Sequence, residues 1–101
     1  MMGTRIVLDE DKIQREGTYD LEKIYQAIDD FALKCDLIKK DKYTYMCRGD
    51  KQDLSNLGLF THQGLLEMDW FTDNLKEWYW IEDGEEEDMM SDIAEIRNYV
   101  G

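Results

Sequence analysis

Apolar residues recur at steps of three and four positions in two segments of the chain, which is the period of an amphipathic helix. The first segment predicts a helix from about Tyr19 to Cys35, with Thr18 as its N-cap. The apolar face of this helix contains Leu21, Ile24, Ile28, Phe31, Ala32 and Cys35. The second segment predicts a helix from about Glu85 to Tyr99, whose acidic first turn suits the positive end of the helix dipole. Its apolar face contains Met89, Ile93, Ile96 and Val100.

Other segments alternate between apolar and polar side chains or are rich in β-branched and aromatic residues, as strands are. They are Thr4–Asp9, Lys42–Arg48, Leu65–Trp70 and Glu77–Ile81, with Leu57–Phe60 as a further short strand. Turn-forming residues between the third and fourth predict that these two form a hairpin. The competing interpretation of that region is a helix from about Leu65 to Tyr79, which would also bring Leu66, Trp70 and Leu75 together.

The order of these elements predicts an α+β fold. We expect a single small domain over residues 1–101, with a mainly antiparallel sheet of three to five strands and two amphipathic helices. A chain of 101 residues has room for one hydrophobic core, and its 12 aromatic residues are more than a disordered chain would carry.

Several classes of protein are disfavoured by composition. No window approaches the roughly 20 consecutive apolar residues of a membrane span, and the first eight residues do not resemble a secretory signal, so we expect a cytoplasmic protein. Two cysteines, Cys35 and Cys47, are fewer than a secreted disulfide scaffold normally has, and we interpret both as thiols.

Charge is distributed unevenly along the chain. The net charge is -12, from 24 acidic and 12 basic residues, and residues 66–101 account for -10 of it. Residues 34–51 instead carry six bases and three acids, a local excess of +3. A protein this acidic is not expected to bind nucleic acid directly through phosphates. Tyr43 and Tyr45, beside these bases, offer only a minor hypothesis of a nucleotide-stacking platform.

The most unusual feature is an acidic run that follows two tryptophans. Trp78 and Trp80 lie two positions apart on one face of the expected strand, and a run of carboxylates comes next. The run consists of Glu82, Asp83, Glu85, Glu86, Glu87 and Asp88. Buried aromatic anchors with charged surroundings are typical of protein interfaces, so these eight residues are the candidate partner-binding site. The simpler explanation is a solvated turn and helix start, with the tryptophans packed in the core.

Other chemistry is weakly represented. The acids lack the alternating spacing of a calcium loop, and Cys35, Cys47 and His62 are too few and too scattered for a zinc site. Nucleophilic catalysis could join either cysteine to His62, but no enzyme signature surrounds them. No phosphate-binding glycine motif is present. We therefore expect no metal, no cofactor and no catalytic residues.

The resulting hypothesis is a small acidic domain that binds a basic protein surface. In its most specific form it is an inhibitor that presents carboxylates where a nucleic-acid-binding protein would bind phosphates. The alternative is a module that self-associates or joins an assembly through its aromatic face, with the acids serving only solubility. An enzyme of unknown class is the third hypothesis.

Overall fold

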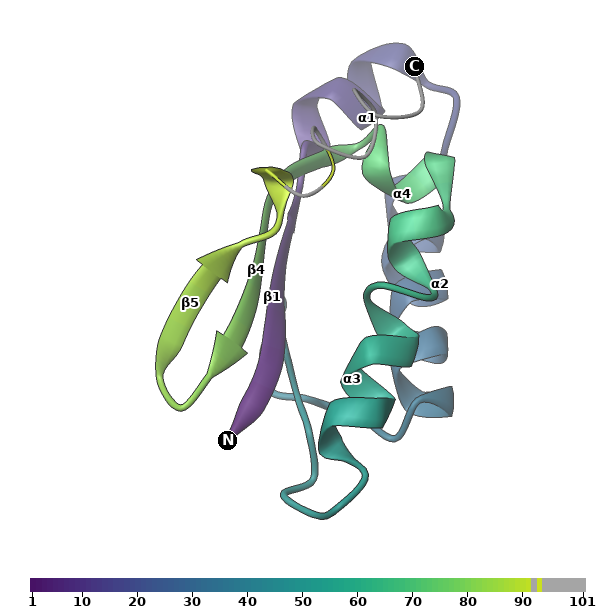
Figure 1. The fold of residues 1–101 in the computed structure, drawn as a ribbon. Helices are drawn as coiled ribbons and strands as arrows, with labels where there is room; N and C mark the ends of the chain where they lie inside the picture. Colours follow the sequence, from purple (N-terminus) through teal and green to yellow (C-terminus); the bar gives the residue numbers. More distant parts are fainter. Residues whose placement is uncertain (92, 94–101) are drawn as a thin grey trace.

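The computed structural model describes residues 1–91 and 93, and it confirms the α+β prediction. Five antiparallel strands form one sheet in the order β2-β3-β1-β4-β5, and the helices lie on one side of it (Figure 1). The strands are β1 (Met2–Leu8), β2 (Ile38–Lys39), β3 (Thr44–Met46), β4 (Leu75–Glu82) and β5 (Glu85–Asp88). The helices are α1 (Glu10–Glu16), α2 (Leu21–Lys34), α3 (Asp53–Phe60) and α4 (Asp69–Thr72), with a 3₁₀ turn η1 (Leu65–Glu67).

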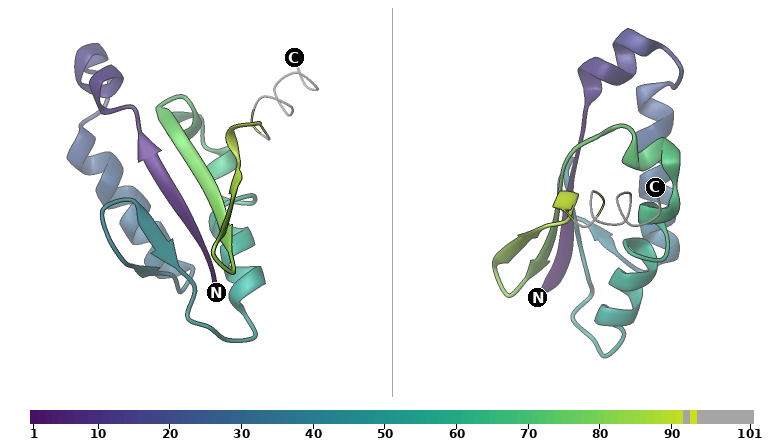
Figure 2. Two further views of the ribbon diagram at one scale, coloured as in Figure 1. Left: turned by 90° about the vertical axis from the view of Figure 1, so that its left-hand side faces the viewer. Right: turned by 45° about the horizontal axis from the view of Figure 1, so that its top comes forward.

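The burial of side chains along the central strand β1 distinguishes the two faces of the sheet. Thr4, Ile6 and Leu8 are buried at alternate positions, whereas Arg5 and Val7 between them are partly exposed. Successive side chains of a strand point to opposite faces, so the buried set defines an inner face, under the helices, and the other set an open face. Figure 2 shows α2, α3 and α4 on this inner face, with α1 beyond the end of β1. The core therefore lies between the sheet and the α2 and α3 layer.

Helix α2 matches the prediction, with a different N-cap. The Asp20 carboxylate, and not Thr18, accepts the backbone N–H groups of Glu22 and Lys23, at 3.0 and 3.4 Å. The reason is geometric, because the first helical turn begins at Leu21 and only the preceding side chain reaches its free N–H groups. The buried face of the helix consists of Ile24, Ile28 and Ala32.

The expected strand Leu57–Phe60 is wrong, because these residues belong to helix α3. Leu57 and Phe60 are both fully buried, and their three-residue separation places them on one side of a helix. Phe60 packs between Phe31 of α2 and Tyr45 of β3, with ring centroids 5.4 and 5.5 Å apart. A strand would have turned one of the two side chains away from this core. Helix α1 was not predicted at all.

The expected hairpin over residues 65–81 is also wrong in its first half. Residues 65–67 and 69–72 form helical turns, and only β4 is a strand. Phe71 decides this, because its side chain is fully buried and packs edge-on against Trp78 at 5.0 Å. The expected strand ended at Trp70, and alternation continued by one residue would have placed Phe71 on the polar side of Glu67 and Asp69. The competing single helix, Leu65 to Tyr79, fails after Thr72, where the chain turns into β4.

The second expected helix, from about Glu85 to Tyr99, is wrong at its start. Residues 85–88 form strand β5, and helical residues begin at Met90 and Ser91. Asp83 and Gly84 both have positive φ, 51° and 82°, as in the two-residue turn that closes a tight hairpin. The hairpin turn therefore prevails over the preference of acids for a helix N-terminus. Residues 92 and 94–99 of the expected helix lie outside the described residues.

Candidate protein-binding hairpin

Strands β4 and β5 form a hairpin that stands away from the helices (Figures 1 and 2). Residues directly opposite each other in antiparallel strands share a face. Trp80 lies opposite Glu87, and Glu82 opposite Glu85, which places all four on the inner face. The other pairs, Ile81 with Glu86 and Tyr79 with Asp88, lie on the open face. The acidic run is thus gathered on one hairpin but divided between its two sides.

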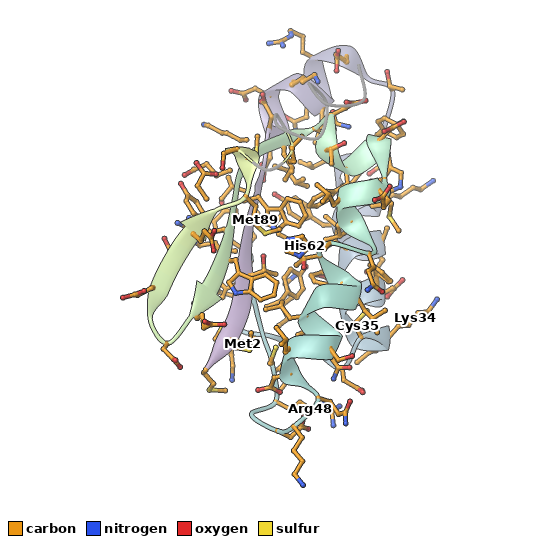
Figure 3. The ribbon with its side chains drawn as sticks, in the orientation of Figure 1. Met2, Lys34, Cys35, Arg48, His62 and Met89 are labelled. Carbon is orange, nitrogen blue, oxygen red and sulfur yellow. The ribbon has the colours of Figure 1, made fainter. Side chains whose placement is uncertain are left out.

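A cleft of about 320 Å³ lies along this hairpin. Its lining consists of Trp80, Glu82, Glu85, Glu86 and Glu87. Trp80 is only partly buried, and its indole contacts the His62 ring with centroids 5.5 Å apart. Figure 3 shows His62 reaching toward the sheet from the turn after α3. The cleft therefore offers an aromatic surface surrounded by carboxylates.

Trp78 does not belong to this surface. It shares the strand face of Trp80, as expected, but none of its side chain is exposed. Its indole Nε1 donates a hydrogen bond to the Thr4 hydroxyl at 2.9 Å, which satisfies the buried N–H group. Trp78 therefore cannot contact a partner in the folded state, and we remove it from the candidate site.

Two carboxylates of the run are already paired. The Arg5 guanidinium donates to both oxygens of Glu86, at 3.1 and 3.0 Å, while it lies over the Tyr79 ring at 4.4 Å. This bidentate contact lowers the pKa of Glu86. Asp83 accepts a hydrogen bond from the Met1 ammonium group at 2.8 Å, which likewise lowers the pKa of Asp83. Both contacts fasten the hairpin to β1.

The other four carboxylates of the run are exposed, and none forms an ion pair with another described residue. They are Glu82, Glu85, Glu87 and Asp88. Three of them surround Trp80 on the inner face. We call Trp80, Glu82, Glu85 and Glu87 the acidic patch, and it is the part of the predicted site that the geometry leaves available to a cation.

The basic segment lies at the opposite edge of the sheet, in and around β2 and β3. Two of the cations in residues 34–51 are paired with acids of other elements, Lys39 with Asp29 at 2.9 Å and Lys42 with Glu10 at 2.9 Å. A third, Arg48, is paired with Asp36 of the same segment at 3.6 Å. Tyr45 is buried, and its hydroxyl donates to the Asp29 carboxylate. A stacking platform of Tyr43 and Tyr45 is therefore excluded, because Tyr45 has no exposed ring face.

No hydrogen bond joins Cys35 or Cys47 to His62 among the described residues. Both cysteines are buried free thiols, and burial raises the pKa of the Cys47 thiol to about 11. His62 instead contacts Trp80 and, through Nδ1, the Thr61 hydroxyl at 3.2 Å. Within residues 1–91 and 93, no three potential ligands among histidine, cysteine and acidic side chains come together as a metal site. No helix in the same range is long and apolar enough to cross a membrane.

A second, larger cleft was not foreseen from the sequence. It measures about 490 Å³ and lies between the start of α2 and Trp70 of α4. Tyr19 and Trp70 supply aromatic walls, and Asp20 and Lys23 supply one charge of each sign. Trp70 therefore belongs to a different surface from Trp80, and the two do not act as anchors of one site.

No family model, curated protein or solved structure matches this chain.

Proposed function

We propose that this protein is an acidic binding domain that docks its β4–β5 hairpin on a basic surface of another protein. The observation that carries the proposal is the acidic patch, in which three carboxylates that pair with no cation of the described residues surround a partly exposed indole in a cleft. An indole face attracts Lys and Arg side chains, and carboxylates bind them by charge-assisted hydrogen bonds. Both features select the same class of partner.

The hairpin backbone that carries these charges is already held in place before a partner binds. A two-residue turn, the Arg5 contact with Glu86 and the ladder between β1 and β4 hold it in place. Preorganisation of this kind lowers the entropic cost of association. The dense negative charge should further accelerate encounter with a basic partner.

The spacing of the acids supports the more specific form of the proposal, inhibition by phosphate mimicry. Every residue of β5 is acidic, and a strand advances about 3.4 Å per residue. One strand of B-DNA carries one phosphate per about 3.4 Å of helix axis. Counted over both faces, the linear density of acids along β5 is therefore close to that of phosphates along a nucleic-acid strand, and the acids of one face lie about 6.8 Å apart. On this ground we infer that a nucleic-acid-binding protein is the basic surface that the hairpin fits best.

The test is retention of partners by three forms of the protein as salt is raised. The hairpin variant carries Glu85→Lys and Glu87→Lys. The control variant carries Glu16→Lys and Glu22→Lys, two exposed positions on α1 and α2, so that both variants change the net charge equally. The host lysate is passed over each form, and retained proteins are identified by mass spectrometry. The wild-type and control forms should retain the same basic proteins, and release them between roughly 0.05 and 0.5 M salt.

Retention of those proteins by the hairpin variant would contradict the proposal, and so would release that does not depend on salt. If the retained proteins are basic but do not bind nucleic acid, the mimicry form fails and the docking surface stands.

The alternative is self-association, and exposed leucines on the helix layer favour it. Leu33 at the end of α2 is 71% exposed, and Leu54 in α3 is 64% exposed. Reversal of Glu85, Glu86 and Glu87 to lysine separates the two functions. Docking on a basic partner predicts loss of that partner with the fold intact. Self-association through apolar side chains predicts that the wild type forms a dimer or larger assembly in sedimentation equilibrium, and that the lysine variant has the same molar mass as the wild type.

A further inference from the structure

Strand β5 is an edge of the sheet that residues 1–91 and 93 form. Among these residues it pairs only with β4, and all four of its residues are exposed. An edge strand presents backbone N–H and C=O groups that can pair with another chain. The direction in which these groups point follows from the hydrogen bonds of the hairpin.

Backbone groups in antiparallel strands point alternately toward one neighbour and the other. The Asp83 N–H donates to the Met1 C=O at 3.0 Å, so the odd residues of β4 pair with β1 and the even ones with β5. Consistently, the Met89 N–H donates to the Trp78 C=O at 2.9 Å. Glu85 and Glu87 therefore direct their backbone groups toward β4, and Glu86 and Asp88 direct theirs outward.

Most of these outward groups are free in the part of the chain that the structure describes. The Asp88 C=O accepts the Ser91 hydroxyl at 3.1 Å. The Asp88 N–H and both backbone groups of Glu86 have no neighbouring strand to pair with. An added strand could therefore form a short ladder centred on Glu86.

We propose that β5 accepts an extended basic segment of the partner as an additional strand. The inference rests on the proposed function and specifies how the partner is held: backbone hydrogen bonds supply part of the affinity, and side-chain charge supplies the selectivity. A second copy of β5 would place carboxylates opposite carboxylates, which disfavours pairing between identical edges. Charge complementarity therefore favours pairing of this edge with a strand that carries lysine or arginine.

The register follows from the same alternation. The partner residue opposite Glu86 exchanges backbone hydrogen bonds with it. The residues opposite Glu85 and Glu87 then occupy the positions without hydrogen bonds, where side chains of paired strands approach most closely. These two positions face the cleft beside Trp80. A segment with a cation at every second position therefore places its cations on the acidic patch and its other side chains beside Glu86, which Arg5 already neutralises.

The experiment separates backbone pairing from simple charge attraction. The probe is a ten-residue peptide of alternating lysine and threonine, capped at both ends, whose binding is measured by isothermal titration calorimetry at low salt. One derivative is N-methylated at every threonine and the other at every lysine, so that both keep the same charge. In the proposed register the threonine N–H groups bond to β5 and the lysine N–H groups point away from it.

Methylation at threonine should weaken binding at least tenfold, and methylation at lysine should change it less than threefold. A matched pair of protein variants compares loss of the outward backbone N–H group of Glu86 with loss of its side-chain charge. Glu86→Pro removes the outward N–H group, which edge strands tolerate, while Glu86→Thr removes only the carboxylate. Binding should be lost in the first variant and kept in the second, and circular dichroism of both checks that the sheet is intact.

Equal binding of the two methylated peptides would overturn strand addition. If, in that case, the unmodified peptide binds the wild type but not the variant with Glu85→Lys and Glu87→Lys, the proposed function stands without strand addition. If the unmodified peptide does not bind the wild type at low salt, strand addition is again refuted, while the lysate experiment continues to test docking on a folded basic surface.

Discussion

The buried pair of Thr4 and Trp78 should have a measurable coupling energy, because the Thr4 hydroxyl accepts the hydrogen bond of the buried Trp78 indole N–H. The Trp78 indole Nε1 donates to Thr4 Oγ1 at 2.9 Å, and the Thr4 hydroxyl donates in turn to the Tyr79 carbonyl at 2.7 Å. Neither Thr4 nor Trp78 has any exposed surface, so water cannot replace a lost partner. The relay joins β1 to β4, the strand that carries the hairpin.

The magnitude follows from what each substitution leaves behind. Thr4→Val keeps the shape of the side chain but leaves the buried indole N–H unpaired, which costs about 1–3 kcal/mol. Trp78→Phe leaves a small cavity and costs about 1–2 kcal/mol, while the Thr4 hydroxyl keeps its bond to Tyr79. In the double variant no indole N–H is left unpaired. Its destabilisation should therefore be smaller than the sum of the two single changes by about 1–2 kcal/mol.

The assay is urea unfolding followed by far-ultraviolet circular dichroism, which does not depend on the fluorescence of the substituted tryptophan. For a domain of this size, the cost of Thr4→Val corresponds to a fall in Tm of about 5–14 °C. Thr4→Ser is the matched control, because it keeps the hydroxyl and loses only a methyl group. Additivity of the two single changes within about 0.5 kcal/mol would refute the hydrogen-bonded pair.

Three further predictions concern the fold and its titrating groups. Gly3→Ala should destabilise the sheet, because its Cβ would lie 2.6 Å from the backbone carbonyl oxygen of Tyr45 on β3, which cannot move aside without disturbing the strand. Gly58→Ala is the contrasting variant: its Cβ meets nothing within 4 Å in α3, so it should raise Tm through about 0.5–1 kcal/mol of helix propensity. At pH 8 the Cys47 thiol should react at least about tenfold more slowly with a disulfide reagent than a thiol with the usual pKa of 9.0, because burial shields its sulfur and raises its pKa to about 11. Urea should abolish the difference. The Glu86 carboxyl should titrate below its usual pKa of 4.5, and Arg5→Met should return the pKa to that value, which nuclear magnetic resonance titration can follow. Because the pKa is lowered in the folded state, the Arg5–Glu86 contact stabilises the fold above pH 4.5, and this stabilisation is lost as pH falls through the lowered pKa.

The elements that the sequence predicted correctly are those whose pattern agrees with their burial. Helix α2 has apolar residues at steps of three and four on one face, so its periodicity was enough to identify it. Strand β1 was identified by its short β-branched composition between charged residues. The expected strands over residues 42–48 and 77–81 were likewise confirmed as β3 and β4. The predictions of short elements were wrong, because a few apolar residues fit both the helix period and the strand period. Phe71 and Phe60 took their conformation from contacts with Trp78, Phe31 and Tyr45, which are distant in sequence.

The candidate site was foreseen in part for a similar reason. That Trp78 and Trp80 share a face was readable from their spacing, but which of them the helix layer covers depends on where α3 and α4 end above the sheet. The strand β5 could have been found from one signal. Asp83 and Gly84 form an Asp-Gly pair between two segments, which is among the strongest short-range indications of a hairpin. The contribution of Arg5 could not have been found, because it lies 81 positions from Glu86.

The composition of β5 indicates that its acids serve more than the fold. Glutamate and aspartate are poor strand formers, and Glu82 and Glu85 are like charges directly opposite each other, so the hairpin is less stable than its geometry allows. A sequence that breaks a local rule is often explained by function. Replacement of Glu85 and Glu87 by threonine should therefore raise the free energy of unfolding by up to about 1 kcal/mol while it weakens binding of the lysine and threonine peptide. Urea unfolding and calorimetry measure the two effects on the same variant. A stabilised variant with unchanged binding would assign these acids to solubility alone, and a destabilised one would show that the fold itself requires them.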